Sequence, residues 1–428
     1  MEKGRVRALL PIGVFLASFL GLGIASGDFN TMPAVVGFLI ALAVAFFQNP
    51  SLKFDEKIKV ITKGVGEENI ITMCLIFLAA GGFSGAVRAA GGVDSTVNFC
   101  LSILPSSVSV MGLMLIGCFI SLSMGTSMGT IAALAPIAGG ISEKTGFSAA
   151  LCIGAVVCGA MFGDNLSMIS DTTIAAVKTQ GCDMKDKFKA NFLIVLPAAV
   201  LSLLIFVLIT RHADYTVEGP LEYNLLKILP YLVVLAGALL GCNVFAVLLG
   251  GTVLSLVVGV ATGEIAPFEM FTSVGEGVTG MYDITVISIL VACVVALMRE
   301  YGGIDSILYF IRKRIRGPRG AQLGIALLTL LVDIATANNT VTIVIAGPIA
   351  REVAREYEIE PKRTASILDI FASVGQGLLP YGAQLLLAAQ AVEAAPFEIM
   401  PYLYYPWLMG VSAVCFMFFT VKKPCSKL

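Results

Sequence analysis

Charged side chains are scarce in this chain of 428 residues. They make up 13% of it, whereas hydrophobic residues make up 57%. A soluble domain usually carries about 25% charged residues. A chain this long and this apolar has too little polar surface to face water on all sides. We therefore expect a multi-pass protein of the plasma (inner) membrane, with membrane lipid as its solvent. The formal net charge of −1 also argues against nucleic acid as a partner.

Histidine and paired cysteines are nearly absent too. The one histidine, His212, falls in a polar loop, and the ten cysteines form no CxxC pair. With no histidine at depth, any proton that crosses the membrane must be carried by carboxylates. The chain has no phosphate-binding GxxxxGK[ST] loop, and no nucleophile–base pair or metal triad is predicted at depth. We therefore expect a transporter without a bound cofactor and not an enzyme.

Long apolar runs are the main feature that is present. Runs long enough to span a bilayer cover about residues 8–26, 33–49, 69–88, 190–210, 224–241, 243–262, 281–300 and 400–420. Four further apolar stretches, at 107–141, 149–177, 321–351 and 364–391, are each interrupted by polar residues and glycine. Their interruptions centre on residues 125–130, 163–165, 336–340 and 375–377.

The interrupted stretches occur in the same order in the two halves of the chain. Ala90–Ser95 resembles Tyr301–Ser306 at a spacing of 211 positions (305 − 94), and Ala135–Ala138 resembles Gly347–Ala350 at one position more. The predicted fold is an all-α polytopic membrane protein with two inverted repeats of about five spans, each containing a re-entrant hairpin and a broken helix. The first repeat is residues 1–210, with its hairpin at about 107–141 and its broken span at about 149–177. The second is residues 211–428, with its hairpin at about 321–351 and its broken span at about 364–391.

The basic residues predict which loops face the cytoplasm. With the N-terminus inside, all but four of the 28 lysine and arginine residues fall on the inner side. The exceptions are Arg88, Lys144, Arg211 and Lys227. The acidic loop Glu264–Glu276 then falls outside. This bias follows the positive-inside rule and predicts that both termini are cytoplasmic. The basic segment Arg312–Arg319 follows an amphipathic stretch and is expected to contact anionic lipid.

The segment Gly163–Thr173 carries the most polar groups within an apolar stretch. Its two carboxylates, Asp164 and Asp171, are costly at the bilayer centre, at least ~2.5 kcal/mol for a charged one. No lysine or arginine is near in sequence, so a bound cation such as sodium, or a proton, is the expected counter-charge. Backbone carbonyls and side-chain oxygens would complete the ion's shell. The candidate oxygen-bearing side chains are Asn165, Ser167, Ser170, Thr172 and Thr173. The alternative is an aqueous loop between two short helices, which the apolar flanks disfavour.

Three other polar groups of residues complete the candidate ion or substrate site. Thr126, Ser127 and Thr130 lie at the first hairpin tip, and Asn338, Asn339 and Thr340 lie at the matching place in the second half. Asp369 and Gln376 lie in the second broken span, and Asp333 lies just before the second tip. Hydrogen bonding between spans is the alternative explanation for the tips and for Asp369. The paired positions of the tips favour a shared central site.

Two motifs resemble those of the NhaC-type sodium/proton antiporter family. Gly125–Thr130 (GTSMGT) resembles the family's GTSWGT motif, and Phe162–Thr173 resembles FGDKMSPLSDTT. Three departures are visible: Asn165 stands where the family often has lysine, Met168 where proline is usual, and residues 377–384 differ from the family's SPLIPWN-like sequence. The resemblance covers most of the chain, although the specific matches concentrate at residues 125–173. It implies inverted repeats with polar hairpin tips that help to bind sodium and substrate.

Two transport functions remain open from the sequence. The first is a secondary antiporter that exchanges sodium, or a similar small cation, for protons, with Asp164 and Asp171 alternating between the two ions. Asp171 is the slightly better candidate for cation contact, because Ser170, Thr172 and Thr173 flank it. The second is a sodium- or proton-coupled transporter of a small organic acid or amino acid. A channel is disfavoured because broken helices fit alternating access better. The sequence leaves a homodimer, the coupling stoichiometry and the direction of flux open.

Overall fold

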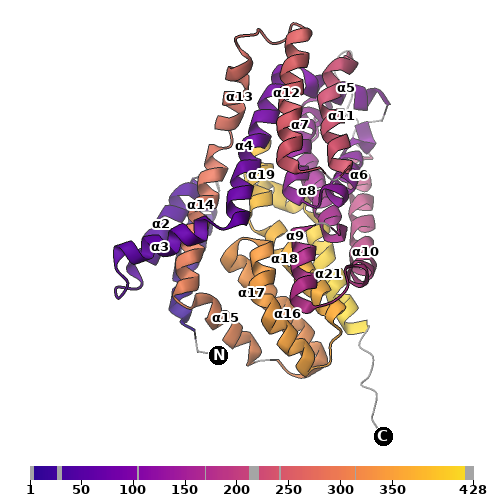
Figure 1. The fold of residues 1–428 in the computed structure, drawn as a ribbon. Helices are drawn as coiled ribbons and strands as arrows, with labels where there is room; N and C mark the ends of the chain where they lie inside the picture. Colours follow the sequence, from indigo (N-terminus) through magenta and orange to yellow (C-terminus); the bar gives the residue numbers. More distant parts are fainter. Residues whose placement is uncertain are drawn as a thin grey trace.

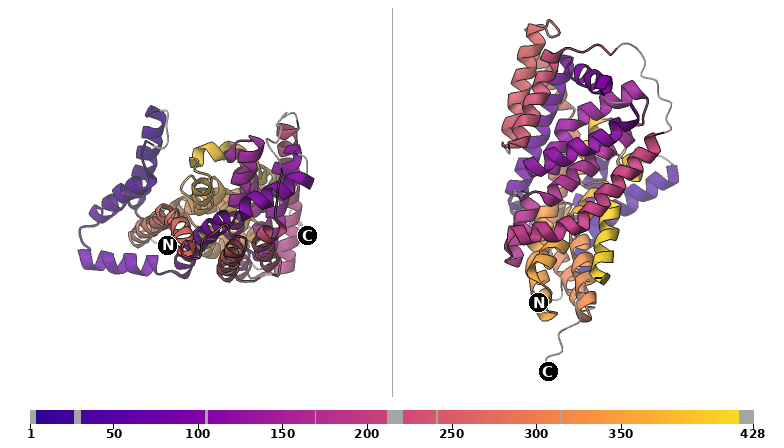
Figure 2. Two further views of the ribbon diagram at one scale, coloured as in Figure 1. Left: turned by 90° about the horizontal axis from the view of Figure 1, so that it is seen from above. Right: turned by 90° about the vertical axis from the view of Figure 1, so that its right-hand side faces the viewer.

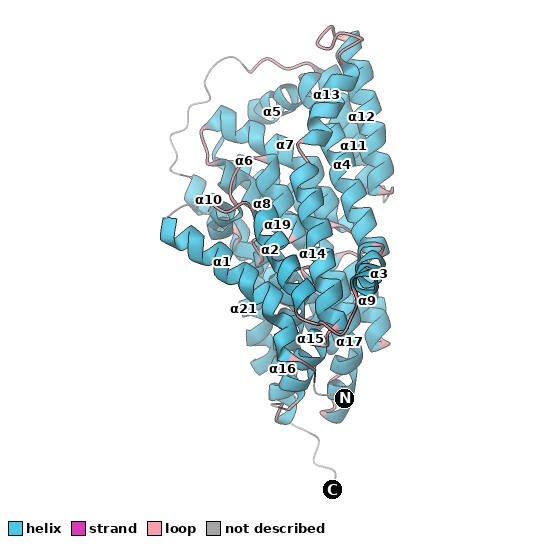
Figure 3. Ribbon diagram, turned by 90° about the vertical axis from the view of Figure 1, so that its left-hand side faces the viewer, coloured by secondary structure: helices cyan, strands magenta, loops and turns pink. Residues whose placement is uncertain are grey.

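The computed structural model describes residues 4–26, 31–103, 106–168, 170–211, 221–240, 242–313 and 315–419. His212 and Arg314 lie outside the described residues. The two extreme ends of the chain, which the sequence predicts to be cytoplasmic, lie outside them as well. Within these ranges the regular elements are all helices (Figure 3). In the first half they are α1 (Leu10–Ser26), α2 (Ala34–Phe47), α3 (Phe54–Val65), α4 (Glu68–Ala89), α5 (Gly92–Ile103), α6 (Ser106–Met124), α7 (Ser127–Thr145), α8 (Ala149–Leu166), α9 (Asp171–Gln180) and α10 (Met184–Thr210). In the second half they are α11 (Leu225–Leu239), α12 (Val244–Ala261), α13 (Met270–Thr279), α14 (Tyr282–Glu300), α15 (Gly303–Arg312), α16 (Gly317–Thr336), α17 (Asn339–Glu356), α18 (Pro361–Leu378), α19 (Ala383–Ala391), α20 (Pro396–Ile399) and α21 (Tyr404–Phe419), with short 3-10 turns η1 (Val6–Leu9) and η2 (Met400–Tyr402).

The helices have the length and composition of membrane spans. Eight candidate spans occur in the described residues, or up to ten if each of two bent pairs counts as one span. The bent pairs are α5 with α6, at 114°, and α20–η2 with α21, at 54°. Two of the spans expected from sequence, 33–49 and 224–241, form helices of only 14 and 15 residues. These are shorter than the roughly 20 residues that cross a bilayer without help.

The outer surface is apolar, as a lipid-facing surface must be. On α10 the exposed side chains include Leu193, Leu204 and Leu208, and on α12 they include Val253 and Val257. In water such a continuous apolar surface would cause aggregation, whereas in a bilayer it is the contact with lipid. Together with the candidate spans, this surface shows a helical multi-pass membrane protein.

The polar interruptions of the helices are shorter than the sequence suggested, and they lie at different residues. α8 continues through Gly163 to Leu166 and breaks only at 167–170, and α18 continues through Gly375 to Leu378 and breaks at 379–382. At the hairpin tips only 125–126 and 337–338 are outside a helix. The glycines serve close packing instead of breaking the helix. A Cβ on Gly163 would lie 2.5 Å from the carbonyl oxygen of Cys118 on α6.

Gly159 gives a direct test of this packing between α6 and α8. A Cβ there would lie 2.1 Å from the Met114 carbonyl oxygen, so Gly159→Ala must force the two backbones apart. We expect it to destabilise the protein by on the order of 1–3 kcal/mol, measured by thermal unfolding in detergent. Gly139→Ala is the control, because nothing lies within 4 Å of its Cβ position. It should be neutral or slightly stabilising, and equal effects of the two substitutions would contradict the packing.

The helix bounds of the two halves correspond at a nearly constant spacing. α8 and α18 begin at residues 149 and 361, and α9 and α19 begin at 171 and 383, each 212 positions apart (361 − 149; 383 − 171). The hairpin tips share a backbone conformation as well. Gly125 (φ 69°) and Ala337 (φ 49°) are left-handed, and the next residues, Thr126 and Asn338, are extended. The Thr126 hydroxyl accepts a hydrogen bond from the Gly129 amide, and the Asn338 side chain accepts one from the Val341 amide.

The two halves are interlocked. α1–α3 come from the first half but α2 and α3 pack against α14, whereas α12 and α13 come from the second half and pack against α4. In Figure 1, α5–α7 and α11–α13 occupy the upper part of the molecule and α15–α17 the lower part. α1–α3 extend sideways from the body, as the view from above shows (Figure 2). The hairpins α6–α7 and α16–α17 therefore come from opposite ends, with their tips turned toward the middle.

Candidate functional site

Both hairpin tips, together with residues at the first helix break and on both sides of the second, line one central cavity of about 110 Å³. The first half contributes residues of the tip at 125–128 and of the break around Asp164 and 170–172. The second half contributes the tip at 337–340 together with Gln376, Ala383 and Gln384. Ser127 and Asn339, which occupy matching places in the sequence, thus face one cavity. Three residues of α4 (Thr72, Met73 and Ile76) close its side.

Asp164 is the buried carboxylate of this cavity, with a side chain 7% exposed. Its Oδ2 accepts a hydrogen bond of 2.9 Å from the Ser127 hydroxyl, and its Oδ1 accepts one of 2.6 Å from the Ser170 hydroxyl. The Ser127 oxygen also accepts a 3.2 Å bond from the amide nitrogen of Gln384. Asp164 therefore joins the first hairpin tip to the first helix break. The cavity lining among the described residues includes no lysine or arginine.

Asp171 differs from Asp164 in its surroundings. It is the first residue of α9 and lines the cavity, but its side chain is exposed. A carboxylate at a helix N-terminus is stabilised by the helix dipole without a cation. The structure thus places the stronger demand for a counter-charge on Asp164, although flanking hydroxyls had favoured Asp171.

The other predicted site residues fall into two groups. Those that line the cavity with the two aspartates are Ser170, Thr172, Thr126, Ser127, Asn338, Asn339, Thr340 and Gln376. Those that lie outside it are Thr130, Ser167, Asn165, Thr173 and Asp369. The Thr130 hydroxyl donates to the Thr126 carbonyl within the first turn of α7, which is a local helix bond. Asn165, Thr173 and Asp369 belong to a separate buried network.

Lys187 is the centre of that network, and the sequence did not reveal it. The pattern of basic residues predicts a cytoplasmic loop for it, but it lies in α10 and is 1% exposed. Its Nζ donates to Asp369 Oδ2 at 2.6 Å, to Thr173 Oγ1 at 2.7 Å and to the Asn165 carbonyl oxygen at 3.2 Å. Although no lysine or arginine is near Asp164 in sequence, the fold thus brings a buried lysine to the residue that follows it, Asn165. Asp369 does not need a transported ion, because Lys187 neutralises it.

Lys187 holds the first helix break together. Asn165 lies in the last turn of α8 and Thr173 in the first turn of α9, so one ammonium group bridges the two sides of the break and ties both to α18 through Asp369. Asn191, one turn further along α10, donates to Asp369 Oδ2 at 2.8 Å and to the same Asn165 carbonyl at 3.0 Å. The Asn165 side chain bonds Ser373 and Tyr405. Lys187 thus lies beside the position where NhaC-type motifs often carry a lysine.

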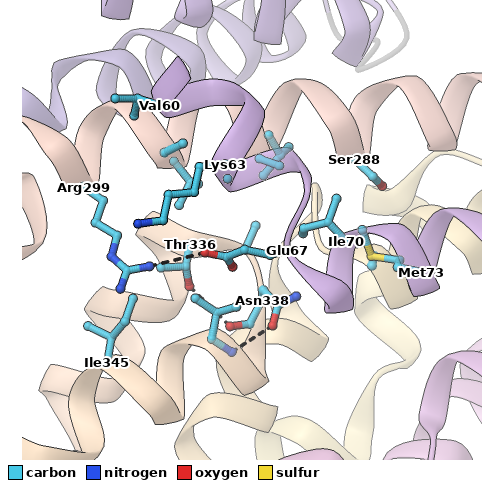
Figure 4. A pocket seen from close by; sticks show the side chains of 18 of the residues that line it. Val60, Lys63, Glu67, Ile70, Met73, Ser288, Arg299, Thr336, Asn338 and Ile345 are labelled. Carbon is cyan, nitrogen blue, oxygen red and sulfur yellow. Dashed lines mark hydrogen bonds and ion pairs between the residues drawn. The ribbon is translucent and has the colours of Figure 1, made fainter. Parts of the chain in front are cut away.

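A second cavity, of about 350 Å³, adjoins the central one (Figure 4). The two share Met73, Ala337, Asn338 and Ala383 in their linings. Four charged residues lie in its wall, Lys63, Glu67, Arg299 and Glu300, and Arg299 forms an ion pair with Glu67 at 3.5 Å. We call this cavity the vestibule. It reaches the central cavity at the second hairpin tip.

Asp333 is a third buried carboxylate and lies in α16. Its Oδ1 accepts a bond of 3.2 Å from the Thr342 hydroxyl, while its Oδ2 has no partner. It lines neither cavity. Among the three buried carboxylates described so far, Asp369 alone has a basic partner in an ion pair.

Comparison with known proteins places the chain in a family. The model of the Na+/H+ antiporter family matches residues 6–209 and 220–421, nearly the whole chain. The "Na(+)/H(+) antiporter NhaC" of Alkalihalophilus pseudofirmus is 21% identical over 95% of this chain and 94% of its own. The "Malate-2H(+)/Na(+)-lactate antiporter" of Bacillus subtilis is 21% identical over 96% and 94%. The "Arginine/ornithine antiporter ArcD" of Halobacterium salinarum is 22% identical over 97% and 91%.

Among solved structures, the YdaH transporter of Alcanivorax borkumensis aligns with 96% of this chain and 98% of its own, at a TM-score of 0.46 and 15% identity. The whole-chain family match carries the assignment, and it agrees with the two motifs at 125–130 and 162–173. This multi-pass membrane protein belongs to the Na+/H+ antiporter family, of the NhaC type, and is a secondary antiporter and not an enzyme.

Proposed function

We propose that this antiporter exchanges sodium, or a similar small cation, for protons at Asp164. The observation that carries the proposal is the isolation of this carboxylate. It is buried, it accepts two hydroxyl hydrogen bonds, and no basic side chain lines its cavity among the described residues. A buried charge without a partner is costly, so Asp164 requires either a proton or a cation. Because one carboxylate serves both ions, each binds best when the other is absent.

The size and chemistry of the central cavity support a small cation. Its volume of about 110 Å³ suits an ion with a few water molecules or a small solute. The lining offers hydroxyl and amide oxygens from Ser127, Ser170, Thr172 and Asn339, which are the ligands that a hard cation prefers. The backbone breaks beside them could supply carbonyl oxygens, as at ion sites in broken transmembrane helices.

We further propose that the two halves are inverted repeats, 1–210 and 211–428, that give alternating access to Asp164. Support comes from the 212-residue correspondence of the helix bounds and from the hairpins that enter from opposite ends. The vestibule then belongs to the inward-facing state, because Lys63 and Arg299 are among the residues assigned to the cytoplasmic side.

The charged loops separate in space as this orientation requires. Arg5 bonds Gly302 at one end of the molecule, and the Arg351 guanidinium lies next to Gly181. Lys227 pairs with Glu264 among the helices that occupy the other end.

In a cysteine-free version, Arg316→Cys should resist an impermeant thiol reagent in intact cells, while Glu269→Cys should react. External labelling of position 316 with protection of position 269 would reverse the orientation.

The proposed exchange is tested in proteoliposomes of the purified protein. A sodium pulse outside, with the proteoliposome interior weakly buffered and carrying a pH dye, should move protons out and raise the internal pH. Lithium and potassium pulses measure selectivity among cations. A wild-type protein that moves no protons in response to any of the three cations would overturn the proposal.

A second candidate is coupled transport of a small organic acid or amino acid. The vestibule favours it, because its 350 Å³ lies in the range of small-molecule sites and its wall carries two basic and two acidic side chains. Relatives named as malate/lactate and arginine/ornithine antiporters act on solutes of these classes. Uptake of radiolabelled dicarboxylates, monocarboxylates and basic amino acids, in the same proteoliposomes with and without a sodium gradient, separates the two functions. Solute uptake without sodium-driven proton movement would replace the first proposal with the second.

A further inference from the structure

We propose that Asp333 is a second proton-binding group of the exchange and that Thr342 and Thr336 form its path to the vestibule. This inference rests on the proposed cation/proton exchange at Asp164 and adds a proton site away from the cation. Asp333 lies on the second hairpin, whereas Asp164 lies at the end of α8 in the first half.

The first support is that Asp333 has no counter-charge. Its side chain is 0% exposed, and within the described part of the chain no lysine or arginine forms an ion pair with it. A single neutral hydroxyl donor at 3.2 Å is a weak compensation for a buried carboxylate. Its Oδ2 has no hydrogen-bond donor at all. A proton on Asp333 removes the larger difficulty, because it cancels the charge, and a neutral oxygen without a donor costs less to bury than an unpaired carboxylate.

The second support is the facing helix α18. A Cβ on Gly375 would lie 2.4 Å from Asp333 Oδ2, so the lone oxygen faces the bare backbone of this glycine. The next residue, Gln376, is also buried, and its Oε1 likewise lacks a donor. Two buried acceptors without donors on facing helices leave a charged Asp333 poorly compensated, which favours its neutral form. Tyr381 is the titratable side chain that follows on this side, and its hydroxyl donates to the Ile334 carbonyl at 2.7 Å.

The third support is a chain of hydroxyl groups that leads from Asp333 to the vestibule. Asp333 Oδ1 lies 3.2 Å from Thr342 Oγ1, which lies 2.7 Å from Thr336 Oγ1, and Thr336 lines the vestibule. Because Thr342 donates to Asp333, Thr336 is the donor in its bond with Thr342, and both hydroxyls are oriented along the chain toward the carboxylate. The Thr336 hydroxyl also lies 3.4 Å from the Asn338 carbonyl oxygen, which competes for the same proton. The chain is then arranged to deliver a proton from vestibule water.

The delivery step balances. A hydronium ion in the vestibule gives a proton to Thr336 Oγ1 and becomes water. The original Thr336 hydroxyl proton passes to Thr342 Oγ1, and the original Thr342 proton passes to Asp333 Oδ1. One O–H bond forms and one breaks at each threonine, and the carboxylate ends as a neutral carboxyl group. The chain then points the opposite way, and for a net proton movement the proton on Asp333 leaves in the other state of the proposed alternating access, when the second hairpin faces the opposite side.

The first half of the chain has no such group at the matching place. The position 212 residues before Asp333 is Ser121 (333 − 212), whose hydroxyl donates to the Ala160 carbonyl at 2.5 Å. The carboxyl group is therefore a specific feature of the second hairpin and not a requirement of the shared packing.

The expected consequence is an electrogenic exchange. Asp164 alone would trade one sodium ion for one proton without net charge. A further proton at Asp333 makes about two protons per sodium ion, so the rate should respond to membrane potential. In proteoliposomes with a valinomycin-set potassium potential, wild-type exchange should vary with voltage. Asp333→Asn should lower the ratio to about one and remove the voltage dependence.

Exchange of labelled sodium for unlabelled sodium, which needs no proton, should survive in Asp333→Asn and shows that the protein is folded.

Thr342→Val should slow sodium/proton exchange on the order of tenfold without changing the ratio of protons to sodium, and Thr342→Ser should restore the rate. Thr329→Val is the matched control, because Thr329 is a buried threonine of α16, the other helix of this hairpin, and its hydroxyl donates to the Ile325 carbonyl of its own helix. An Asp333→Asn protein with the wild-type ratio and voltage dependence, or a Thr342→Val protein that matches Thr329→Val, would overturn the inference. If wild-type protein moves no protons with sodium, the proposed function fails instead.

Discussion

Replacing Asp164 with asparagine should abolish sodium-driven proton movement, with a loss of at least about 100-fold in the exchange rate. Asparagine keeps the shape of the side chain, and its carbonyl oxygen can still accept one of the two hydroxyl bonds from Ser127 and Ser170. It cannot take up a proton or carry the negative charge that a cation needs. The measurement is the pH change inside proteoliposomes after a sodium pulse.

Two other aspartates serve as comparisons for Asp164→Asn. Asp94 is exposed on α5 and does not line either cavity, so Asp94→Asn should exchange at the wild-type rate. Asp171→Asn should raise the sodium concentration for half-maximal rate without abolishing exchange, because Asp171 lines the cavity but is exposed. Retention of wild-type exchange by Asp164→Asn would remove the residue on which the mechanism depends.

Replacing Lys187 with methionine should destabilise the protein by about 3–5 kcal/mol and inactivate it. The change leaves Asp369 buried and unpaired and removes the bridge between Asn165 and Thr173 across the first break. Thermal unfolding in detergent measures the stability, and the sodium pulse measures the activity. The double variant Lys187→Met/Asp369→Asn should recover much of the stability, because no uncompensated charge remains.

The control for Lys187→Met is the pair of Lys227 with Glu264, which is partly exposed, with the two side chains 17% and 46% accessible. Lys227→Met removes a salt bridge of similar length, but exposed pairs are worth about 0–1 kcal/mol, so its effect should be small. A Lys187→Met protein as stable as Lys227→Met would show that the buried pair carries little energy. Stability regained without activity in the double variant would show that the bridge across the break is needed for exchange.

The local sequence predicted the elements that apolar length and polar interruption can define. The hairpins and the broken helices follow from patterns within a few tens of residues. The placement of Ser127 and Asn339 at one cavity follows from the correspondence between the two halves of the chain. The position of each break was less accurate. Gly163 and Gly375 suggested breaks at the wrong residues, because in a tightly packed bundle glycine allows helices to approach each other.

Contacts between distant segments could not be predicted in the same way. Lys187 follows a charged stretch at the start of a long apolar helix, which reads as a cytoplasmic loop, and its partner Asp369 is 182 positions away. The signal in the sequence that could have revealed this contact was Asp369 itself, because a carboxylate within a membrane span requires a partner. The difference between Asp164 and Asp171 likewise depends on burial. Asp164 is buried in α8, which packs against α6 and α7, whereas Asp171 at the start of α9 is exposed.

The central claim, that one carboxylate holds either sodium or a proton, is tested most directly by the pH dependence of sodium affinity. Initial rates of exchange are measured in proteoliposomes over a series of external sodium concentrations at several external pH values. Simple competition predicts that the sodium concentration for half-maximal rate rises as the pH falls, approaching about tenfold per pH unit, while the maximal rate stays constant. A half-maximal sodium concentration that does not change with pH would contradict a shared site at Asp164.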